Sequence, residues 1–513
     1  MNGAEALLRT LLASGVDTCF ANPGTSEMHF VAALDRVPGM RAVLGLFEGV
    51  VAGAADGYGR MTSRPAATLF HCGPGLANGL SLLHNARRSR TPIVNIVGDQ
   101  ATYHAPLDPP LTTDVEAWAA PVSCWVRTTT RTPELGEDAA EAVWAARCPP
   151  GGIATLVLPS DVSWNPGGRP GAARPVPAPA AVTTDAVKDA ARALASREPA
   201  LLLLGGSALL EPGLTYALRV ASATGAKVMA PTFNARIARG RGRFAVDSIA
   251  YPAAQAIAEM AGIRHVILVG ATLPVGFFAY PDTPGTFTPA DAVAHTLAGP
   301  EHDLADALAR LGDELGCPEV RPASEASSIT PGRGTNTPEG AARTLAALLP
   351  EDAIVVDEAI TLRAAFFAAT RHAARHDYLQ IPGGAIGGGL PVATGAAVAC
   401  PGRRVIAVQA DGSAMYTLQA FWTQAREKLD VTTVILANRK YAVLFHELTR
   451  VQAGAGPTAH DLFDLARPDL DWQGMARAMG VEAARADTLE RFADLLSYGN
   501  SRPGPLVIEL TLA

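Results

Sequence analysis

The sequence predicts an α/β protein of three domains, each a doubly wound parallel sheet flanked by helices. Short apolar runs alternate with helical patterns along the chain of 513 residues, as expected for strand–helix units whose parallel sheets are buried on both faces. Two segments rich in proline and small residues, 165–181 and 318–338, interrupt this alternation and have the composition of linkers. We therefore expect domains at 1–164, 182–317 and 339–513.

The composition excludes several classes of protein. The net charge is −7 and no basic stripe occurs, so nucleic acid is not an expected partner. No apolar run approaches the roughly 20 residues that span a bilayer, and residues 1–12 resemble an amphipathic helix more than a signal peptide because they contain Glu5 and Arg9. The six cysteines lack CxxC spacing, which predicts reduced thiols in the cytoplasm without structural zinc or disulfides.

In the third domain, polar residues follow two neighbouring strand candidates. Asp411 follows the run 404–408, a helix is expected over 414–428, and Asn438 follows the run 431–436. Open α/β sheets bind ligands at the carboxyl ends of their strands, and carboxylate and amide oxygens suit Mg²⁺. Gly412 and Ser413 precede the helix, where backbone N–H groups can bind a diphosphate.

In the first domain, Glu48 lies between an apolar run at 41–46 and an apolar, glycine-dotted helix expected over 48–58. A glutamate at a helix start is commonly solvated and simply favours the helix dipole. The apolar surroundings favour burial instead, which would raise the carboxyl pKa. Further strands are expected at 66–70 and 93–97, with a helix over 76–87 between them.

Glycine clusters mark the other candidate ligand loops. The third domain contains GGAIGGG at 383–389, and its Ile386 lies 25 residues before Asp411 in the ADGS turn at 410–413. In the middle domain, strand candidates at 200–204 and 265–269 end in glycine, but no GxGxxG fingerprint is present. Close approach of a ligand to the backbone is a common reason for such clusters.

Together these motifs resemble those of thiamine diphosphate-dependent enzymes. Residues 410–413 and Asn438 are similar to the family's GDG-to-Asn motif, with Ala410 and Arg439 as departures from it. The run EGVVAGAADGYGR at 48–60 resembles the helix that carries the family's catalytic glutamate, and NPGTSE at 22–27 resembles the NPGSNE turn of benzoylformate decarboxylase. The chain is identified, over nearly its whole length, as a member of the acetolactate synthase and benzoylformate decarboxylase group.

The resemblance implies roles for individual residues. Glu48 would activate the cofactor through its aminopyrimidine ring, and Ile386 would hold the cofactor in its bent conformation. Mg²⁺ would be held by Asp411, Asn438 and the backbone carbonyl of Lys440. The other implied cofactor contacts are Pro23, Gly24, Asn78, Thr361, Gly412, Ser413 and Tyr441.

The same resemblance bears on the reaction. Thr25 stands where the decarboxylase has an active-site serine, and His71 falls on its first catalytic histidine, although His71 could also be a buried histidine bound to backbone. The second catalytic histidine has no counterpart, because residues 276–280 read GFFAY. Substrate-pocket candidates are Val443, Leu444, Phe445 and His446; His446 could contact a carboxylate or cap a surface helix.

The expected function is that of a thiamine diphosphate- and Mg²⁺-dependent 2-oxo acid decarboxylase or carboligase. A C2 carbanion of the cofactor would attack the 2-oxo acid, CO₂ would leave, and the product would be protonated or add to a second carbonyl. Acetolactate synthase proper is the rival within the class, and a non-catalytic paralogue is the rival outside it. The absence of a GxGxxG fingerprint in the middle domain and the chain length of 513 residues, shorter than typical FAD-bearing synthases, argue against binding of FAD. The family's shared active sites imply a homodimer at least, with a homotetramer expected.

Overall fold

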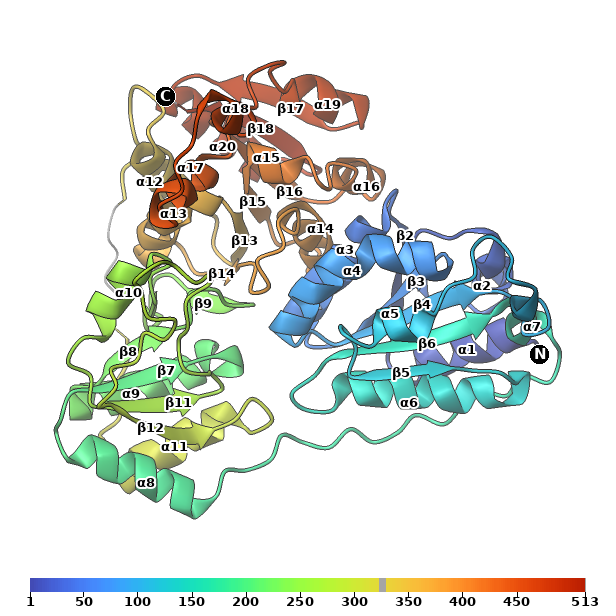
Figure 1. The fold of residues 1–513 in the computed structure, drawn as a ribbon, viewed down its shortest axis with the longest axis horizontal. Helices are drawn as coiled ribbons and strands as arrows, with labels where there is room; N and C mark the ends of the chain where they lie inside the picture. The colour runs from blue at the N-terminus through green and yellow to red at the C-terminus, as the bar shows by residue number, and fades with distance from the viewer. Residues whose placement is uncertain (323–328, 513) are drawn as a thin grey trace.

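A computed structural model describes residues 1–322 and 329–512, and it confirms three α/β domains with helices on their sheets (Figure 1). Residues 323–328, inside the second expected linker, and residue 513 lie outside the described residues. The first linker, 165–181, has no helix or regular strand and joins the first domain to the middle domain as an extended segment. The exact domain boundaries stay a prediction.

The first domain is built on a six-stranded, wholly parallel sheet. Its strands, in spatial order, are β2 (Arg41–Leu44), β1 (Thr18–Ala21), β3 (Ala66–Phe70), β4 (Ile93–Asp99), β6 (Ile153–Pro159) and β5 (Trp125–Thr128). Its helices are α1 (Gly3–Ala13), α2 (Met28–Arg36), α3 (Glu48–Thr62), α4 (Cys72–Ser89), α5 (Val115–Ala119), α6 (Leu135–Arg147) and α7 (Ser160–Trp164), with short 3₁₀ turns η1 (Thr25–Glu27), η2 (Ala105–Leu107) and η3 (Thr132–Glu134). The central strands are buried throughout, as a parallel sheet covered on both faces requires.

The middle domain has a five-stranded parallel sheet. Its spatial order is β10 (Asp247–Ser248), β8 (Lys227–Ala230), β7 (Ala200–Leu204), β11 (His265–Val269) and β12 (Val293–Ala298). The helices are α8 (Thr184–Ala195), α9 (Gly213–Thr224), α10 (Ala253–Met260) and α11 (Leu304–Glu314), with the turn η4 (Gly206–Leu209). The two expected strands are therefore the central pair, β7 and β11.

The third domain has a seven-stranded sheet, and one of its strands comes from the middle segment. The order is β17 (Glu482–Ala486), β18 (Leu506–Thr511), β16 (Val431–Ala437), β15 (Val405–Ala410), β13 (Ala353–Glu358), β14 (His376–Leu379) and β9 (Ile237–Arg239). β9 pairs antiparallel with β14, whereas the other pairs are parallel. The helices are α12 (Pro338–Leu348), α13 (Arg363–Ala369), α14 (Gly389–Ala399), α15 (Asp411–Ala414), α16 (Ala420–Arg426), α17 (Ala442–Arg450), α18 (Pro457–Asp461), α19 (Trp472–Ala478) and α20 (Leu489–Ser501), with turns η5 (Ile360–Leu362) and η6 (Thr370–His372).

The prediction of one continuous helix over 414–428 is wrong. Helical structure stops after Ala414 and resumes at Ala420, with turns between them. In the break, the Thr417 hydroxyl donates a hydrogen bond of 2.7 Å to the Gly387 carbonyl of the glycine loop. A long-range contact therefore overrides the local helical preference, as tertiary packing often does.

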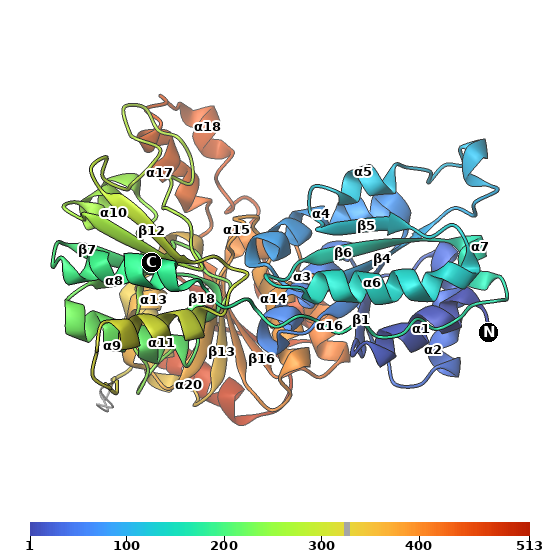
Figure 2. The same cartoon turned by 90° about the horizontal axis from the view of Figure 1, so that it is seen from below.

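The first and third domains meet where helices α3 and α14 pack together (Figures 1 and 2). A Cβ atom on Gly57 would lie 2.1 Å from the Val392 carbonyl oxygen, and one on Gly395 would lie 1.8 Å from the Ala54 carbonyl oxygen. Both distances are far below van der Waals contact, so glycine is required for this backbone approach.

A buried arginine ties this contact to the middle segment. Arg60, at the end of α3, forms an ion pair with Asp56 whose two side chains are almost wholly buried. The Arg60 guanidinium also donates a 2.5 Å hydrogen bond to the Gln380 carbonyl of the third domain and a 3.4 Å bond to the Ala235 carbonyl of the middle segment. A buried charge is tolerated when it is paired and hydrogen-bonded in this way.

None of the helices within residues 1–322 and 329–512 combines the length and the apolarity needed to cross a bilayer. The six cysteines are free thiols, as the sequence predicts.

We expect Gly395→Ala to destabilise the protein by about 1–3 kcal/mol, because the added methyl group overlaps the Ala54 carbonyl oxygen. Gly285→Ala is the matched control: a Cβ there meets nothing within 4 Å, and exposed substitutions of this kind usually change stability by less than about 0.5 kcal/mol. Thermal and denaturant unfolding of both variants measures the difference. Equal stability of the two variants would contradict the close packing of α3 on α14.

Candidate active site

Glu48 is the first residue of α3 and follows strand β2. Its side chain is buried, with 7% of the residue exposed, and its Oε2 accepts a 3.0 Å hydrogen bond from the Asn78 amide on α4. A Cβ on Gly75 would lie 3.2 Å from the other carboxylate oxygen, Oε1. Because residue 75 is glycine, Oε1 keeps free space beside it.

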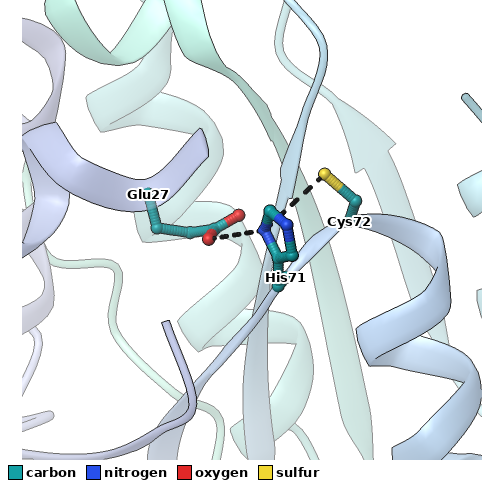
Figure 3. Close-up of side chains that lie close together, drawn as sticks. All are labelled: Glu27, His71 and Cys72. Carbon is teal, nitrogen blue, oxygen red and sulfur yellow. Dashed lines mark hydrogen bonds and ion pairs between the residues drawn. The ribbon is translucent and has the colours of Figure 1, made fainter. Parts of the chain in front are cut away.

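His71 lies between β3 and α4 and is paired with a buried carboxylate that the sequence interpretation did not single out (Figure 3). Its Nδ1 is 3.0 Å from Glu27 Oε2, which also accepts a 2.7 Å hydrogen bond from the Gly24 N–H. Since an ionised carboxylate only accepts hydrogen bonds, Nδ1 carries the imidazole proton in this pair. Nε2 of His71 then has a free lone pair.

Two glycines hold this pair in place. A Cβ on Gly24 would lie 2.3 Å from the His71 ring, and one on Gly98 would lie 1.7 Å from Glu27 Oε1. The backbone of the turn at residue 24 packs directly against the His71 ring, and the backbone of strand β4 packs directly against the Glu27 carboxylate. Neither side chain can shift far without moving backbone.

Asp411 follows strand β15 and is buried, with 3% of the residue exposed. Its carboxylate accepts hydrogen bonds from the N–H groups of Gly412, at 2.8 Å, and Arg439, at 2.7 Å. Burial raises the pKa of the Asp411 carboxyl, while the backbone hydrogen bonds oppose the rise. Within the described residues, no lysine, arginine or histidine forms an ion pair with it.

The segment after β16 faces Asp411. Asn438 is half-buried, and its side-chain oxygen accepts a 3.1 Å hydrogen bond from the N–H of Lys440, which is exposed. The Tyr441 ring packs on Gly412, where a Cβ would lie 2.4 Å from the ring. Ser413 is buried, and its hydroxyl donates to the Ala410 carbonyl at 3.1 Å.

The glycine loop at 383–389 is held from inside by Glu358, the last residue of β13. The Glu358 carboxylate accepts 2.5 Å hydrogen bonds from the N–H groups of Gly387 and Gly389. The residue is 2% exposed, and burial raises its carboxyl pKa to about 7. Ile386, the residue before the first of these glycines, is half-buried.

The first domain holds the same loop from outside through α4. The Asn85 amide donates a 2.7 Å hydrogen bond to the Ala385 carbonyl, and its oxygen accepts a 3.1 Å bond from the Ala385 N–H. His84 Nε2 lies 3.1 Å from the Gly383 carbonyl. Asn85 comes seven residues after Asn78 on the same helix, so α4 contacts both the Glu48 carboxylate and the glycine loop.

The remaining predicted residues make fewer contacts. Thr25 is exposed at the start of η1, while Pro23 and Thr361 are half-buried. Val443, Leu444, Phe445 and His446 lie on α17, where Leu444 and His446 are exposed and the Phe445 ring packs edge-on against Phe463. No hydrogen bond or ion pair between described residues joins Glu48 or His71 to Asp411 or Asn438. The predicted residues thus form two groups on one chain.

The residues that sequence reasoning missed are Glu27, Asn85 and Glu358. Glu27 belongs to the NPGTSE turn, and its position three residues after Gly24 is that of a capping glutamate, which was the available signal. Glu358 ends strand β13, three residues before the predicted cofactor contact Thr361. Asn85 gave no local signal, because its partner lies 300 residues away.

Comparison with known proteins places the chain in a family. Residues 1–117 match the family model "Thiamine pyrophosphate enzyme, N-terminal TPP binding domain", and residues 363–510 match the corresponding C-terminal TPP binding domain. A Mycobacterium tuberculosis protein named "Putative acetolactate synthase large subunit IlvX" is 51% identical over 514 residues, covering 100% of this chain and 99% of that protein. Benzoylformate decarboxylase of Pseudomonas aeruginosa is 30% identical over 535 residues, covering 97% and 96%.

Solved structures share the whole fold. The thiamine diphosphate-dependent 4-hydroxybenzoylformate decarboxylase of Rhodococcus jostii RHA1 superposes with a TM-score of 0.86 at 24% identity, covering 100% of this chain and 99% of that one. The chain belongs to the thiamine pyrophosphate enzyme family. Within it, the protein is a thiamine diphosphate-dependent enzyme of the acetolactate synthase and benzoylformate decarboxylase type.

The residues present fit the cofactor's charged end. Asp411 is a buried carboxylate without an ion-pair partner among the described residues, and it accepts a hydrogen bond from the N–H of Arg439, the residue that follows Asn438. A hard divalent cation accepts this donor set and would compensate the buried charge. The free space beside Glu48 Oε1 likewise leaves that oxygen available to a polar group of a ligand.

We expect Glu358→Gln to change how stability depends on pH. The folded protein raises the carboxyl pKa from 4.5 to about 7, so it binds the proton more tightly than the unfolded chain does. Wild type therefore loses unfolding free energy as pH rises from about 4.5 to about 7, by about 3 kcal/mol at most. The glutamine variant lacks this loss, and denaturant titrations at a series of pH values measure it.

Glu351→Gln, at an exposed ion pair with Arg241, is the control and keeps the wild-type pH profile. Parallel profiles for wild type and Glu358→Gln would show that Glu358 keeps its ordinary pKa in the folded protein.

Proposed function

We propose that the protein is a thiamine diphosphate- and Mg²⁺-dependent 2-oxo acid decarboxylase or carboligase. The observation that carries the proposal is Glu48, a buried carboxylate with one oxygen bound by Asn78 and the other beside the free space at Gly75. Thiamine diphosphate supplies, when bound, a carbon nucleophile and an electron sink for loss of CO₂. The family assignment makes this the relevant cofactor.

The metal end of the cofactor would be held by the third domain. Asp411, Asn438 and the backbone carbonyl of Lys440 provide three oxygen ligands for Mg²⁺, which commonly completes its octahedron with phosphate and water. Further cofactor contacts would come from residues near α15 and η5 and from the turn before η1: Gly412, Ser413, Tyr441, Thr361, Pro23 and Gly24. Ile386 would support the cofactor from the glycine loop, which Glu358 and Asn85 hold in place.

Two side chains of the first domain would move protons. Glu48 exchanges a proton at Oε1, the oxygen that Asn78 leaves free. His71 donates a hydrogen bond from Nδ1 to Glu27. Its Nε2 is therefore the nitrogen that would accept a proton from the reacting oxygen or carbon, or return one to it. Thr25 lies at the start of the same turn as Glu27 and is exposed for substrate contact.

The middle-domain loop at 276–280 supports a carboligation outcome. Where the decarboxylase resemblance would place a second histidine, the Tyr280 hydroxyl donates a 2.9 Å hydrogen bond to Glu447 on α17. Burial and the neighbouring Glu447 carboxylate raise the Tyr280 pKa, which makes the phenol a weaker acid. With fewer proton donors near the site, addition to a second carbonyl competes with aldehyde release.

Acetolactate synthase is the second candidate function, and the relative with 51% identity and that name favours it. The substrate would contact α17 through Val443, Leu444, Phe445 and His446. We further propose a homodimer as the minimum assembly, with a homotetramer expected, because active sites in this family form between one subunit's first domain and a partner's third. Absence of FAD and a cytoplasmic location stay predictions from the sequence.

The function is tested by supplying thiamine diphosphate, Mg²⁺ and a panel of 2-oxo acids, with products identified by mass. We expect CO₂ release with an aldehyde or mixed acyloin, and loss of turnover after chelation that added Mg²⁺ restores. Acetolactate as the main product from pyruvate alone would select the second candidate. No CO₂ from any 2-oxo acid, with the cofactor demonstrably bound, would overturn both.

Glu48→Gln should lower kcat by about 10²–10⁴-fold, the usual contribution of a positioned acid–base group, while the fold stays intact by circular dichroism. Glu137→Gln is the matched control, because Glu137 also lies in the first turn of a helix but its side chain is 64% exposed. It should retain full activity. Wild-type turnover in Glu48→Gln would remove the proposed role of this carboxylate.

A further inference from the structure

The first domain contains one cluster whose chemistry the proposed reaction does not use in full. Glu27, His71 and Cys72 place a carboxylate oxygen, an imidazole nitrogen and a thiol sulfur within 4.8 Å of one another (Figure 3). No other set of three such residues meets this criterion within residues 1–322 and 329–512. We propose that this cluster is an inhibitory binding site for Zn²⁺ or a similar borderline divalent cation.

The spacing of the ligand atoms suits a tetrahedral ion. His71 Nδ1 lies 3.0 Å from Glu27 Oε2 and 3.9 Å from Cys72 Sγ. Zinc bonds of about 2.0–2.3 Å at tetrahedral angles require ligand separations of about 3.3 Å for oxygen to nitrogen and about 3.6 Å for nitrogen to sulfur. These two separations lie within a few tenths of an ångström of the zinc values, and the Glu27 oxygen and the Cys72 sulfur lie within 4.8 Å of each other, where zinc requires about 3.6 Å.

The backbone holds the three ligands in this arrangement. Cys72 begins α4 with a positive φ of 52°, a strained conformation for a residue other than glycine, which is common at functional sites. The Ser26 hydroxyl lies 3.2 Å from Cys72 Sγ and 3.1 Å from His71 Nδ1. This hydroxyl donates a 2.5 Å hydrogen bond to Glu27 Oε1, and it could turn to donate to the thiolate once the metal is bound. The close approaches of Gly24 and Gly98 keep the His71 ring and the Glu27 carboxylate in position.

The ligand types select the metal. A thiolate with an imidazole and a carboxylate is a zinc donor set, whereas Mg²⁺ prefers an all-oxygen site such as the one around Asp411. Binding releases the Cys72 thiol proton, and the proton on His71 Nδ1 moves to Nε2, so the metal-bound imidazole stays neutral.

The consequence for activity rests on the proposed function of His71. Coordination at Nδ1 would remove the His71–Glu27 hydrogen bond and leave the ring proton on Nε2, so Nε2 could no longer accept a proton. The His71 side chain is 26% exposed, whereas the Glu27 side chain is fully buried, so the ion would enter past the histidine. The fourth coordination position would be taken by water or by a substrate oxygen.

Metal binding is tested first with Co²⁺, which replaces Zn²⁺ and gives a near-ultraviolet charge-transfer band only when a thiolate coordinates it. The enzyme loaded with thiamine diphosphate and Mg²⁺ is titrated with Co²⁺, so the all-oxygen site contributes no such band. We expect the band in wild type and in Cys124→Ser, the control at an exposed cysteine, and its loss in Cys72→Ser. A band that persists in Cys72→Ser, or none in wild type, overturns the site whatever the enzyme's reaction.

Inhibition is tested with Zn²⁺ in the assay for CO₂ release. Cys72→Ser should raise the half-inhibitory Zn²⁺ concentration at least about tenfold, the effect of losing about 1.4 kcal/mol of binding free energy, with turnover without zinc near that of wild type. Cys72→Ala provides a second variant, and thermal melts check that both are folded. A cobalt band without zinc inhibition retains the site but overturns its inhibitory role; equal sensitivity of wild type and both variants overturns that role as well.

Discussion

The positions of Glu48 and of the glycine loop at 383–389 depend on the backbone contact between α3 and α14. These helices approach so closely that glycine is required at Gly57 and Gly395. Glu48 is the first residue of one helix, and the glycine loop that contains Ile386 leads directly into the other. A fixed packing of two helices therefore sets where the proposed catalytic carboxylate and the loop proposed to support the cofactor lie relative to each other, although they are more than 300 residues apart in the chain.

Three buried carboxylates of the first and third domains are stabilised in two different ways. Asp56 is paired with Arg60, Glu358 accepts two backbone N–H groups, and Asp411 accepts two others without a cationic partner. A carboxylate in a buried ion pair stabilises the fold but is not free to bind a ligand. A carboxylate bound only by N–H groups keeps lone pairs for a metal or a proton. The hydrogen-bond partners of a buried carboxylate therefore indicate whether it only stabilises the fold, as Asp56 does, or keeps lone pairs for a ligand, as Asp411 does.

Local patterns predicted the fold well and the site in part. The three domains, the central strands and the strand-end positions of Asp411 and Asn438 follow from apolar runs that end in polar or glycine residues. The partners of these residues could not be predicted in the same way. Glu27 meets His71 across 44 residues, and Asn85 meets Ala385 across 300, so both contacts exist only after sheets and domains have packed. The helix break after Ala414 has the same origin, because Thr417 bonds the distant glycine loop.

Strand β9 makes the middle segment part of the third domain's sheet. It pairs along β14 and covers what would otherwise be the outer edge of that sheet. An exposed edge offers unpaired N–H and C=O groups to other chains and promotes aggregation. The middle segment is thus not a detachable insertion between two cofactor-binding domains, even if it binds no cofactor itself. A shortened chain that joins the first domain directly to the third would lack this protective strand, so a minimal version of the enzyme would have to retain residues 237–239 or replace them.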